Sequence, residues 1–408
     1  MTTLQALRPV MPILISASLM LTLSFGIRQS MGLYMPAVTS DIAVTITDFT
    51  AAIALQNLVW GFCQPVAGIA ADKWGFRPVM LFGALCFVLG MITFSAANGV
   101  LMVLFGAGIC VGVGMACASF AMTLSVTSRL VPVSVRSTAL GIVSAAGSIG
   151  AMITAPYAQY LEGALDWRLS LIGLAILSAF IVPAAWIAGR VDKEAPLELS
   201  SDNSDKLPAG AAIKGAFKNP SFVVMTMAYF VCGMQLVFLT THLPSYLQIC
   251  GMDPMLGASA IGIIGGFNIL GSLFFGWAGS RWNKQALLGI IYCCRSIVLA
   301  WYFILPPTAS TTILFAALMG FLWLGVSPLV AGSVIEMFGL RWQAMLQGFA
   351  FFSHQFGSFL GAFGGGWLFD KFGSYDVALQ LGIGMGLTAG TIQIIFALIR
   401  PPRSPIRT

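Results

Sequence analysis

Two arginines lie inside long apolar stretches of the sequence, at Arg28 and Arg295, and no Asp or Glu falls within the apolar core of any such stretch. A charged side chain at membrane depth costs about 2.5–3.5 kcal/mol on insertion scales, so it normally faces a cavity or a partner. An anionic small molecule is a natural counter-ion, because a guanidinium can hold a carboxylate through two parallel hydrogen bonds. The alternative for both residues is an arginine that binds backbone carbonyls or reaches an interface.

Other polar residues in apolar stretches are weaker candidates for the same site. Arg28 shares a helical stripe with Ser24 and Gly32, which is typical of a cavity face. His354 has a reference pKa of about 6.5 and could exchange protons, although a single His in a helix bundle is more often a packing residue. The candidate substrate-binding residues are Arg28, Gln56, Asn57, Tyr229, Asn268, Arg295 and His354.

The elements that must position these residues follow from composition. Of the 408 residues, 58% are hydrophobic and only 8% are charged, against about 25% charged in a soluble domain. This excludes a soluble globular enzyme and a disordered chain.

Stretches of about 20 apolar residues span a bilayer. Twelve are present, at about 11–35, 50–71, 78–97, 100–128, 134–158, 168–189, 221–247, 257–279, 285–305, 311–334, 344–368 and 376–399. We therefore expect an all-α membrane protein with twelve transmembrane helices.

Several classes of partner are not expected. The net charge is +6, but the basic residues are scattered singly between apolar stretches, so the sequence does not indicate nucleic-acid binding. The eight cysteines form no C-x-x-C pair and no Cys/His metal spacing. No phosphate-binding G-x-x-x-x-G-K-(S/T) loop occurs. We expect no metal, no cofactor and no drive by ATP.

Basic residues between the stretches predict the orientation. If both termini are cytoplasmic, 16 of the 20 Lys and Arg residues face the cytoplasm, and only Arg168 and Lys371 face outward. The 16 are Arg8, Lys73, Arg77, Arg129, Arg136, Arg190, Lys193, Lys206, Lys214, Lys218, Arg281, Lys284, Arg341, Arg400, Arg403 and Arg407. The positive-inside rule then predicts a multi-pass protein of the cell (inner) membrane with both termini cytoplasmic.

The chain also divides into two similar halves. The polar segment 190–220 separates six stretches from six, which predicts bundles at 1–189 and 221–408 joined by a cytoplasmic linker. Within it, the run 211–217 is expected to lie as a short helix on the membrane surface. Gly68 and Gly276 begin similar segments 208 residues apart, close to half the chain. Such a duplicated six-helix unit is typical of transporters.

The first of these two segments resembles the signature of the major facilitator superfamily, G-x-x-x-D-(R/K)-x-G-x-(R/K). Its defined positions are Gly68, Asp72, Lys73, Gly75 and Arg77. The resemblance implies the major facilitator fold and a gating role for these residues and for Arg281 in the second half, with Asp72 latching the two halves together. Ser280 replaces the acid in the second copy, so its latch should be weaker. The alternative is a plain tight turn.

Two further segments resemble bacterial relatives of monocarboxylate transporters. They are Phe25–Tyr34 and Gly365–Tyr375. This resemblance implies a secondary transporter of a small organic anion, as a monomer in the lipid bilayer, with or without proton symport. A major facilitator exporter of amphipathic or drug-like compounds is the alternative, and a membrane-embedded enzyme or sensor is less favoured. The absence of carboxylates from the apolar cores and of paired histidines argues against a membrane-embedded enzyme.

Overall fold

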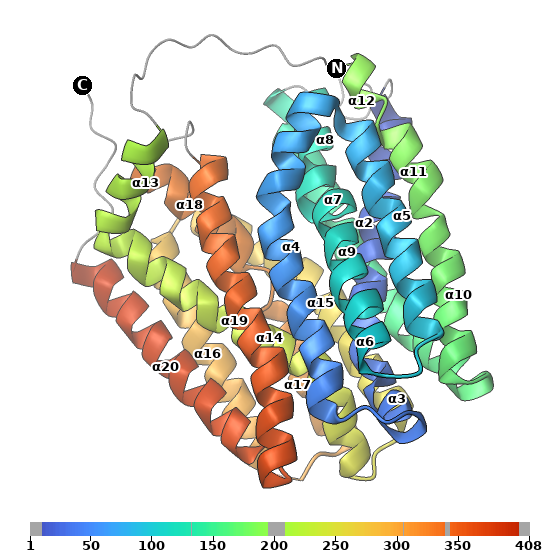
Figure 1. Ribbon diagram of the computed structural model, residues 1–408. Helices are drawn as coiled ribbons and strands as arrows, with labels where there is room; N and C mark the ends of the chain where they lie inside the picture. The colour runs from blue at the N-terminus through green and yellow to red at the C-terminus, as the bar shows by residue number, and fades with distance from the viewer. Residues whose placement is uncertain (1–9, 132, 195–208, 305, 339–342, 400–408) are drawn as a thin grey trace, which may run out of the picture. The chain divides into compact units, whose positions relative to one another are not determined.

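The computed structural model describes residues 10–131, 133–194, 209–304, 306–338 and 343–399, and the regular structure in them is entirely helical (Figure 1). Eleven helical segments of this part of the chain are long and apolar enough to cross a membrane. The predicted eleventh span is α19, a continuous helix of 30 residues that is not among them. Its polar residues, which include Gln347, Ser353, His354 and Gln355, lower its hydropathy.

By compactness the chain divides into two units, Met1–Glu198 with Thr240–Gly266, and Leu199–Leu239 with Phe267–Thr408. The helices from the N-terminus to residue 194 are α2 (Met11–Ser30), η2 (Met31–Tyr34), α3 (Met35–Asp41), α4 (Ile46–Trp74), α5 (Phe76–Ser95), α6 (Val100–Val103), the π-helical segment η3 (Leu104–Cys110), α7 (Val111–Ala118), α8 (Phe120–Leu130), α9 (Val133–Ala164), α10 (Trp167–Ala179), α11 (Ile181–Ala188) and α12 (Val191–Glu194).

The remaining helices are α13 (Ala209–Lys218), α14 (Pro220–Ile249), α15 (Pro254–Gly279), α16 (Lys284–Ile304), α17 (Ala309–Phe321), α18 (Val326–Phe338), α19 (Gln343–Phe372) and α20 (Asp376–Ile399). The predicted spans agree with these helices to within a few residues at most ends. The predicted division at 189 and 221 stays a prediction.

Glycines allow the closest helix pairs to form. In the first unit α2 lies along α9 (Figure 1), and a Cβ added at Gly150 would overlap the carbonyl oxygen of Thr22. In the second unit α19 lies against α14 in the same way, because a Cβ at Gly357 would overlap the carbonyl oxygen of Phe230. Small residues at such contacts let backbones approach without losing dispersion contacts.

The fourth and tenth spans each contain a break in the helix. The fourth span changes from α7 to α8 at Ser119, whose φ of −117° and ψ of −143° are not helical. The tenth span unwinds over residues 322–325, between α17 and α18. Both interruptions leave backbone groups without their usual helical partners, which is costly in a membrane unless other groups bind them.

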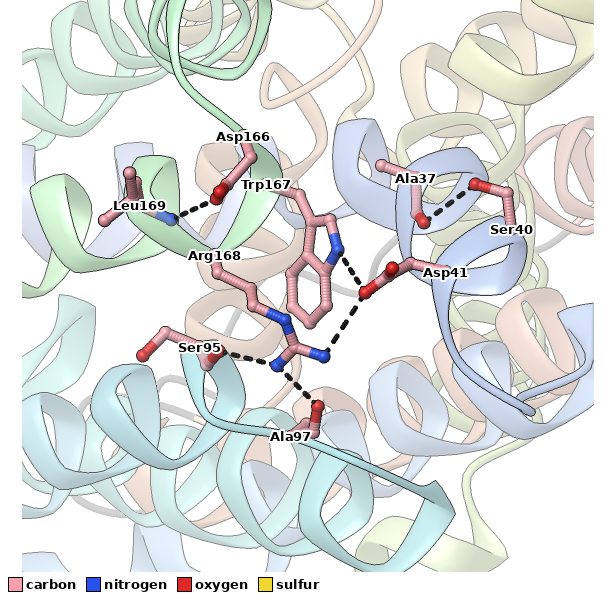
Figure 2. Close-up of polar contacts among 9 residues, drawn as sticks. All are labelled: Ala37, Ser40, Asp41, Ser95, Ala97, Asp166, Trp167, Arg168 and Leu169. Carbon is pink, nitrogen blue, oxygen red and sulfur yellow. Dashed lines mark hydrogen bonds and ion pairs between the residues drawn. The ribbon is translucent and has the colours of Figure 1, made fainter.

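Arg168, one of the two basic residues predicted to face outward, ties three chain segments together (Figure 2). Its guanidinium donates to the carbonyl oxygens of Ser95 and Ala97, at 3.2 and 2.8 Å, and to Asp41 at 3.2 Å. The indole nitrogen of Trp167 donates to the same carboxylate oxygen of Asp41 at 3.1 Å. This arginine therefore joins the end of α5 and the end of α3 to the start of α10.

Candidate functional site

Arg28 lies near the C-terminal end of α2 and is held by polar neighbours. One terminal nitrogen of its guanidinium donates to Oε1 of Gln29 at 2.7 Å, and the other donates to Oδ1 of Asn57 at 2.6 Å. Its central carbon lies 5.4 Å from the centroid of the Trp60 ring. Gln29, Asn57 and Trp60 are all buried. The arrangement fixes the plane of the guanidinium between α2 and α4.

The charge of Arg28 has no acidic partner in the described part of the chain. The ion pairs described there join Arg168 to Asp41 and Lys284 to Glu336. Both acceptors of Arg28 are neutral amide oxygens, and its Nε is buried without a hydrogen-bond partner among the described residues. A guanidinium carries five N–H donors in a fixed fork. Nε therefore keeps an unused N–H donor of the kind from which carboxylates accept.

A chain of polar contacts continues from this arginine toward the break in the fourth span. The indole nitrogen of Trp60 donates to Oε1 of Gln64 at 2.9 Å. Nε2 of Gln64 donates to the carbonyl oxygen of Ala116 at 3.2 Å, just before α7 ends. The side-chain oxygen of Ser119 at the break is buried without a partner. These contacts connect the neighbourhood of Arg28 to an irregular backbone segment, as binding sites in transporters often do.

Gln56 is beside Asn57 in sequence but has a different partner. Its Nε2 donates to the carbonyl oxygen of Ala107 at 2.7 Å and contacts the sulfur of Met31 at 3.1 Å. Ala107 belongs to the π-helical segment, where the ordinary helical hydrogen bonds are displaced. Gln56 therefore stabilises the fourth span, and the geometry favours a packing role for it.

Arg295, in the second unit, is the largest of the fully buried side chains. It donates to the carbonyl oxygen of Leu322 at 2.9 Å and to the sulfur of Cys232 at 3.2 Å. The amide oxygen of Asn268 accepts from the backbone nitrogen of Leu324 at 2.8 Å. Arg295 and Asn268 thus bind the backbone groups that the break in the tenth span leaves free. This geometry favours the alternative interpretation of Arg295, as a residue bound to backbone carbonyls.

Tyr229 and His354 lie together in the second unit. Their ring centroids are 4.6 Å apart, across the contact of α14 with α19. Nδ1 of His354 lies 3.2 Å from Oε1 of Gln355 and 3.5 Å from the hydroxyl of Ser358. Tyr229 is buried, whereas His354 is half-buried. The imidazole therefore has hydrogen-bonding neighbours that suit either of its protonation states.

The signature segment is more helical than the sequence suggested. Helix α4 runs to Trp74 and α5 begins at Phe76, so the connection between them is Gly75 alone, with φ of 93°. The apolar stretches at 50–71 and 78–97 leave Asp72 between them, and the structure places Asp72 within the last turn of α4. The side chain of Asp72 lies outside the described residues. Only glycine adopts this positive φ readily, so Gly75 is required by the turn itself.

Asp192 is a residue of this region that sequence reasoning did not single out. Its two carboxylate oxygens accept from the backbone nitrogens of Phe76 and Arg77, at 2.7 and 2.9 Å. The acid thereby caps the positive N-terminal end of α5. No sequence pattern predicts this contact, because Asp192 lies 116 residues from Phe76 in a segment with several other acids.

The basic residues of the signature and of its second copy pack against tryptophan rings. Lys73 lies 5.7 Å from the ring centroid of Trp74, Arg77 lies 4.7 Å from Trp186, and Arg281 lies 4.4 Å from Trp277. A Cβ added at Gly68, or at its counterpart Gly276, would meet open space within its own unit. Packing among the described residues of its own unit therefore does not require a glycine at either position.

Sequence comparison identifies the family to which these features belong. The profile of the Major Facilitator Superfamily matches residues 17–362. The chain belongs to the major facilitator superfamily. This major facilitator protein is therefore an all-α, multi-pass membrane transporter, as the sequence predicted. The family and the names of its relatives indicate a transporter rather than an enzyme.

Curated relatives of this major facilitator protein are distant but extend along much of the chain. It is 24% identical over 366 residues to Monocarboxylate transporter 11 of Mus musculus, covering 87% of this chain and 80% of the relative. It is 25% identical over 402 residues to Monocarboxylate transporter 13 of Bos taurus, covering 96% and 91%. It is 25% identical over 264 residues to the Fujikurins efflux protein of Gibberella fujikuroi, covering 63% and 53%. The resemblance to monocarboxylate transporters is thereby confirmed.

A hollow in the second unit of this major facilitator protein lies apart from the predicted residues. It has a volume of about 280 Å³, and its wall is almost wholly apolar. Residues of α14, α19 and α20 line it, among them Met234, Gln235, Phe238, Leu360 and Trp367. None of the seven candidate binding residues lines it, so it is not the anion site that the sequence predicted.

Proposed function

We propose that this transporter carries a small organic anion, a monocarboxylate in the simplest case, by alternating access, and that Arg28 binds the anionic group. The observation that supports this is a guanidinium held by Gln29 and Asn57, whose Nε has no hydrogen-bond partner and whose charge has no carboxylate partner among the described residues. The names of two relatives, both monocarboxylate transporters, support the same class of substrate.

Electrostatics favours an anion at this position over a neutral or cationic ligand. An unpaired charge removed from water is costly, and a charge-assisted, bidentate pair recovers much of that cost. Trp60 stabilises the cation through its ring but cannot neutralise it. A carboxylate that accepts from Nε of Arg28 would supply the missing counter-charge.

A ligand screen by thermal shift tests the substrate class directly. Purified protein would be heated with monocarboxylates, dicarboxylates, amino acids and cationic dyes. A ligand that binds only the folded protein at 100 times its Kd stabilises it by about 2.7 kcal/mol. We expect stabilisation by carboxylates that is lost when the acid is replaced by its amide. Stabilisation by the dyes alone would contradict the proposal.

Export of amphipathic compounds is the second candidate function. It is supported by similarity to the Fujikurins efflux protein over 63% of the chain. The screen separates the two functions, because an exporter of this kind would be stabilised by hydrophobic compounds whether or not they carry a carboxylate.

We further propose that the protein lies in the cell (inner) membrane with both termini cytoplasmic. The support is the excess of Lys and Arg on one set of loops, 16 residues against Arg168 and Lys371. In this orientation Gly75 and Asp192 lie on the cytoplasmic side.

We propose that Asp72 governs conformational exchange and does not contact substrate. Asp72→Asn removes the charge at nearly constant shape, so it should weaken a latch made of charge-assisted hydrogen bonds. Transport into proteoliposomes should fall while the substrate Kd stays unchanged. Asp48→Asn, at the first turn of the same helix, is the control. Unchanged transport, or lost binding, would contradict the role.

We propose that proton coupling, where it occurs, involves His354 or the substrate carboxylate. No Asp or Glu lies in the apolar cores of the spans, so the usual acidic proton carrier is missing. With a reference pKa of about 6.5, His354 should impose a pH dependence on transport between about pH 5.5 and 7.5. His354→Gln should flatten that profile, and His242→Gln should leave it intact. An unchanged profile in His354→Gln would exclude this residue as the titrating group.

A further inference from the structure

Helix α13 presents three different faces along its 10 residues. Successive residues turn by about 100°, so residues four apart share a face. Ala212 and Ala216 form a buried face. Ile213 and Phe217 form an apolar face on which Phe217 is 51% exposed. Lys214 and Lys218 form a third face that is exposed.

Chain connectivity places this helix at the edge of the bilayer. Only Asn219 separates it from α14, a membrane span that begins at Pro220. Ten residues rise about 15 Å, half of what a span requires. The ring of Phe217 packs against Phe222 of α14 and Phe349 of α19, with centroids 6.0 and 5.7 Å away. These contacts hold α13 in a fixed position beside the lipid.

The two lysines of α13 form no ion pair with any acid in the part of the chain that the structure describes. The helix carries no Asp or Glu, and neither ammonium forms an ion pair within the described residues. Two cations one turn apart therefore lie next to a membrane surface, beside an exposed aromatic ring. This pattern of a basic face next to an apolar face is typical of helices that bind an interface of anionic lipids.

We propose that α13 is a docking site for anionic phospholipids. Lys214 and Lys218 bind headgroup phosphates, and the face of Ile213 and Phe217 lies against the upper part of the acyl chains. Each basic residue near an anionic surface contributes about fivefold in affinity. The site fixes the start of α14 to the bilayer, and it does not depend on the identity of the transported substrate.

Hydrogen exchange in nanodiscs tests this proposal. Backbone exchange over residues 209–218 would be measured in nanodiscs of phosphatidylcholine with increasing amounts of phosphatidylglycerol. We expect phosphatidylglycerol to protect this segment. The apparent affinity of the segment for phosphatidylglycerol should fall roughly 20- to 30-fold in Lys214→Gln/Lys218→Gln, from the fivefold contribution of each residue. High salt should weaken the protection in the native protein, because the site is exposed.

Two matched variants identify the source of the effect. Lys193→Gln removes an exposed lysine of α12 and should behave as the native protein does. Phe217→Ser should reduce protection in both lipids alike, because it removes only the apolar contact. Equal protection in the two lipids, or an equal effect of Lys193→Gln, would overturn the proposal. So would protection by inorganic phosphate in phosphatidylcholine nanodiscs, which would indicate a site for soluble anions.

Discussion

Arg28→Ala should nearly abolish carboxylate binding in a protein that still folds. Removing one partner of a buried, hydrogen-bonded charge pair costs about 2–5 kcal/mol, or roughly 30- to several-thousand-fold in affinity. Arg28→Lys should bind more weakly than the native protein but better than the alanine variant, because it keeps the charge and loses the planar fork. Isothermal titration with the carboxylate found in the thermal-shift screen would measure all three affinities.

Asn57→Asp tests the same proposal by adding a negative charge beside Arg28. The amide oxygen of Asn57 already lies 2.6 Å from the guanidinium, so the substitution supplies a carboxylate at nearly unchanged shape. The new acid would neutralise Arg28 from within the protein. Carboxylate affinity should then fall, and the new ion pair should offset the loss of the hydrogen bond that Nδ2 of Asn57 donates to the carbonyl oxygen of Ile53 at 2.7 Å. Unchanged affinity in a folded Arg28→Ala variant would show that the anion binds elsewhere.

Arg295 provides a comparison with Arg28, because its contacts with Leu322 and Cys232 favour a structural role. Arg295→Ala leaves the carbonyl oxygen of Leu322 without its donor, and an orphaned buried group costs about 1–3 kcal/mol. We expect a lower melting temperature and an unchanged Kd for the fraction that folds. A loss of affinity as large as that of Arg28→Ala would instead assign Arg295 to the substrate site.

Gly357→Ala should strongly destabilise the second unit, whereas Gly364→Ala should not. A Cβ at Gly357 would overlap the carbonyl oxygen of Phe230, so α14 and α19 would have to move apart. Overpacking of this kind typically costs about 1–3 kcal/mol and occasionally more. At Gly364, two turns along the same helix, an added Cβ meets open space in its unit. There the better helix propensity of alanine should add about 0.5–1 kcal/mol.

Thermal unfolding in detergent, followed by circular dichroism, would compare the two glycine variants. Gly361→Ala should behave like Gly357→Ala, because its Cβ would overlap the carbonyl oxygen of Met234. Equal melting temperatures for Gly357→Ala and Gly364→Ala would contradict the close contact between α14 and α19.

Sequence patterns predicted the helices well because bilayer thickness fixes their length and composition. Arg28 and Asn57 could also be predicted as candidate site residues, because a charge and an amide are rare and costly in apolar stretches. The side chains that contact them could not be predicted. Gln29 and Trp60 join the site through side-chain directions that spacing along a helix does not determine. The contacts of Asn268 and Arg295 with the break in the tenth span could not be predicted, because that break has no strong sequence signal.

The caps of two equivalent helices differ in when they can form during synthesis. Helix α16 begins after Asn283, whose own side chain accepts from the backbone nitrogens of Gln285 and Ala286 at 2.9 and 3.2 Å. That cap is available as soon as the ribosome has made a few more residues. Helix α5 must wait for Asp192, more than a hundred residues later. Chains fold from the N-terminus as they emerge. The N-terminal end of the third span therefore has no cap from Asp192 until the sixth span has been made. A chain whose synthesis stops before residue 192 would lack this cap.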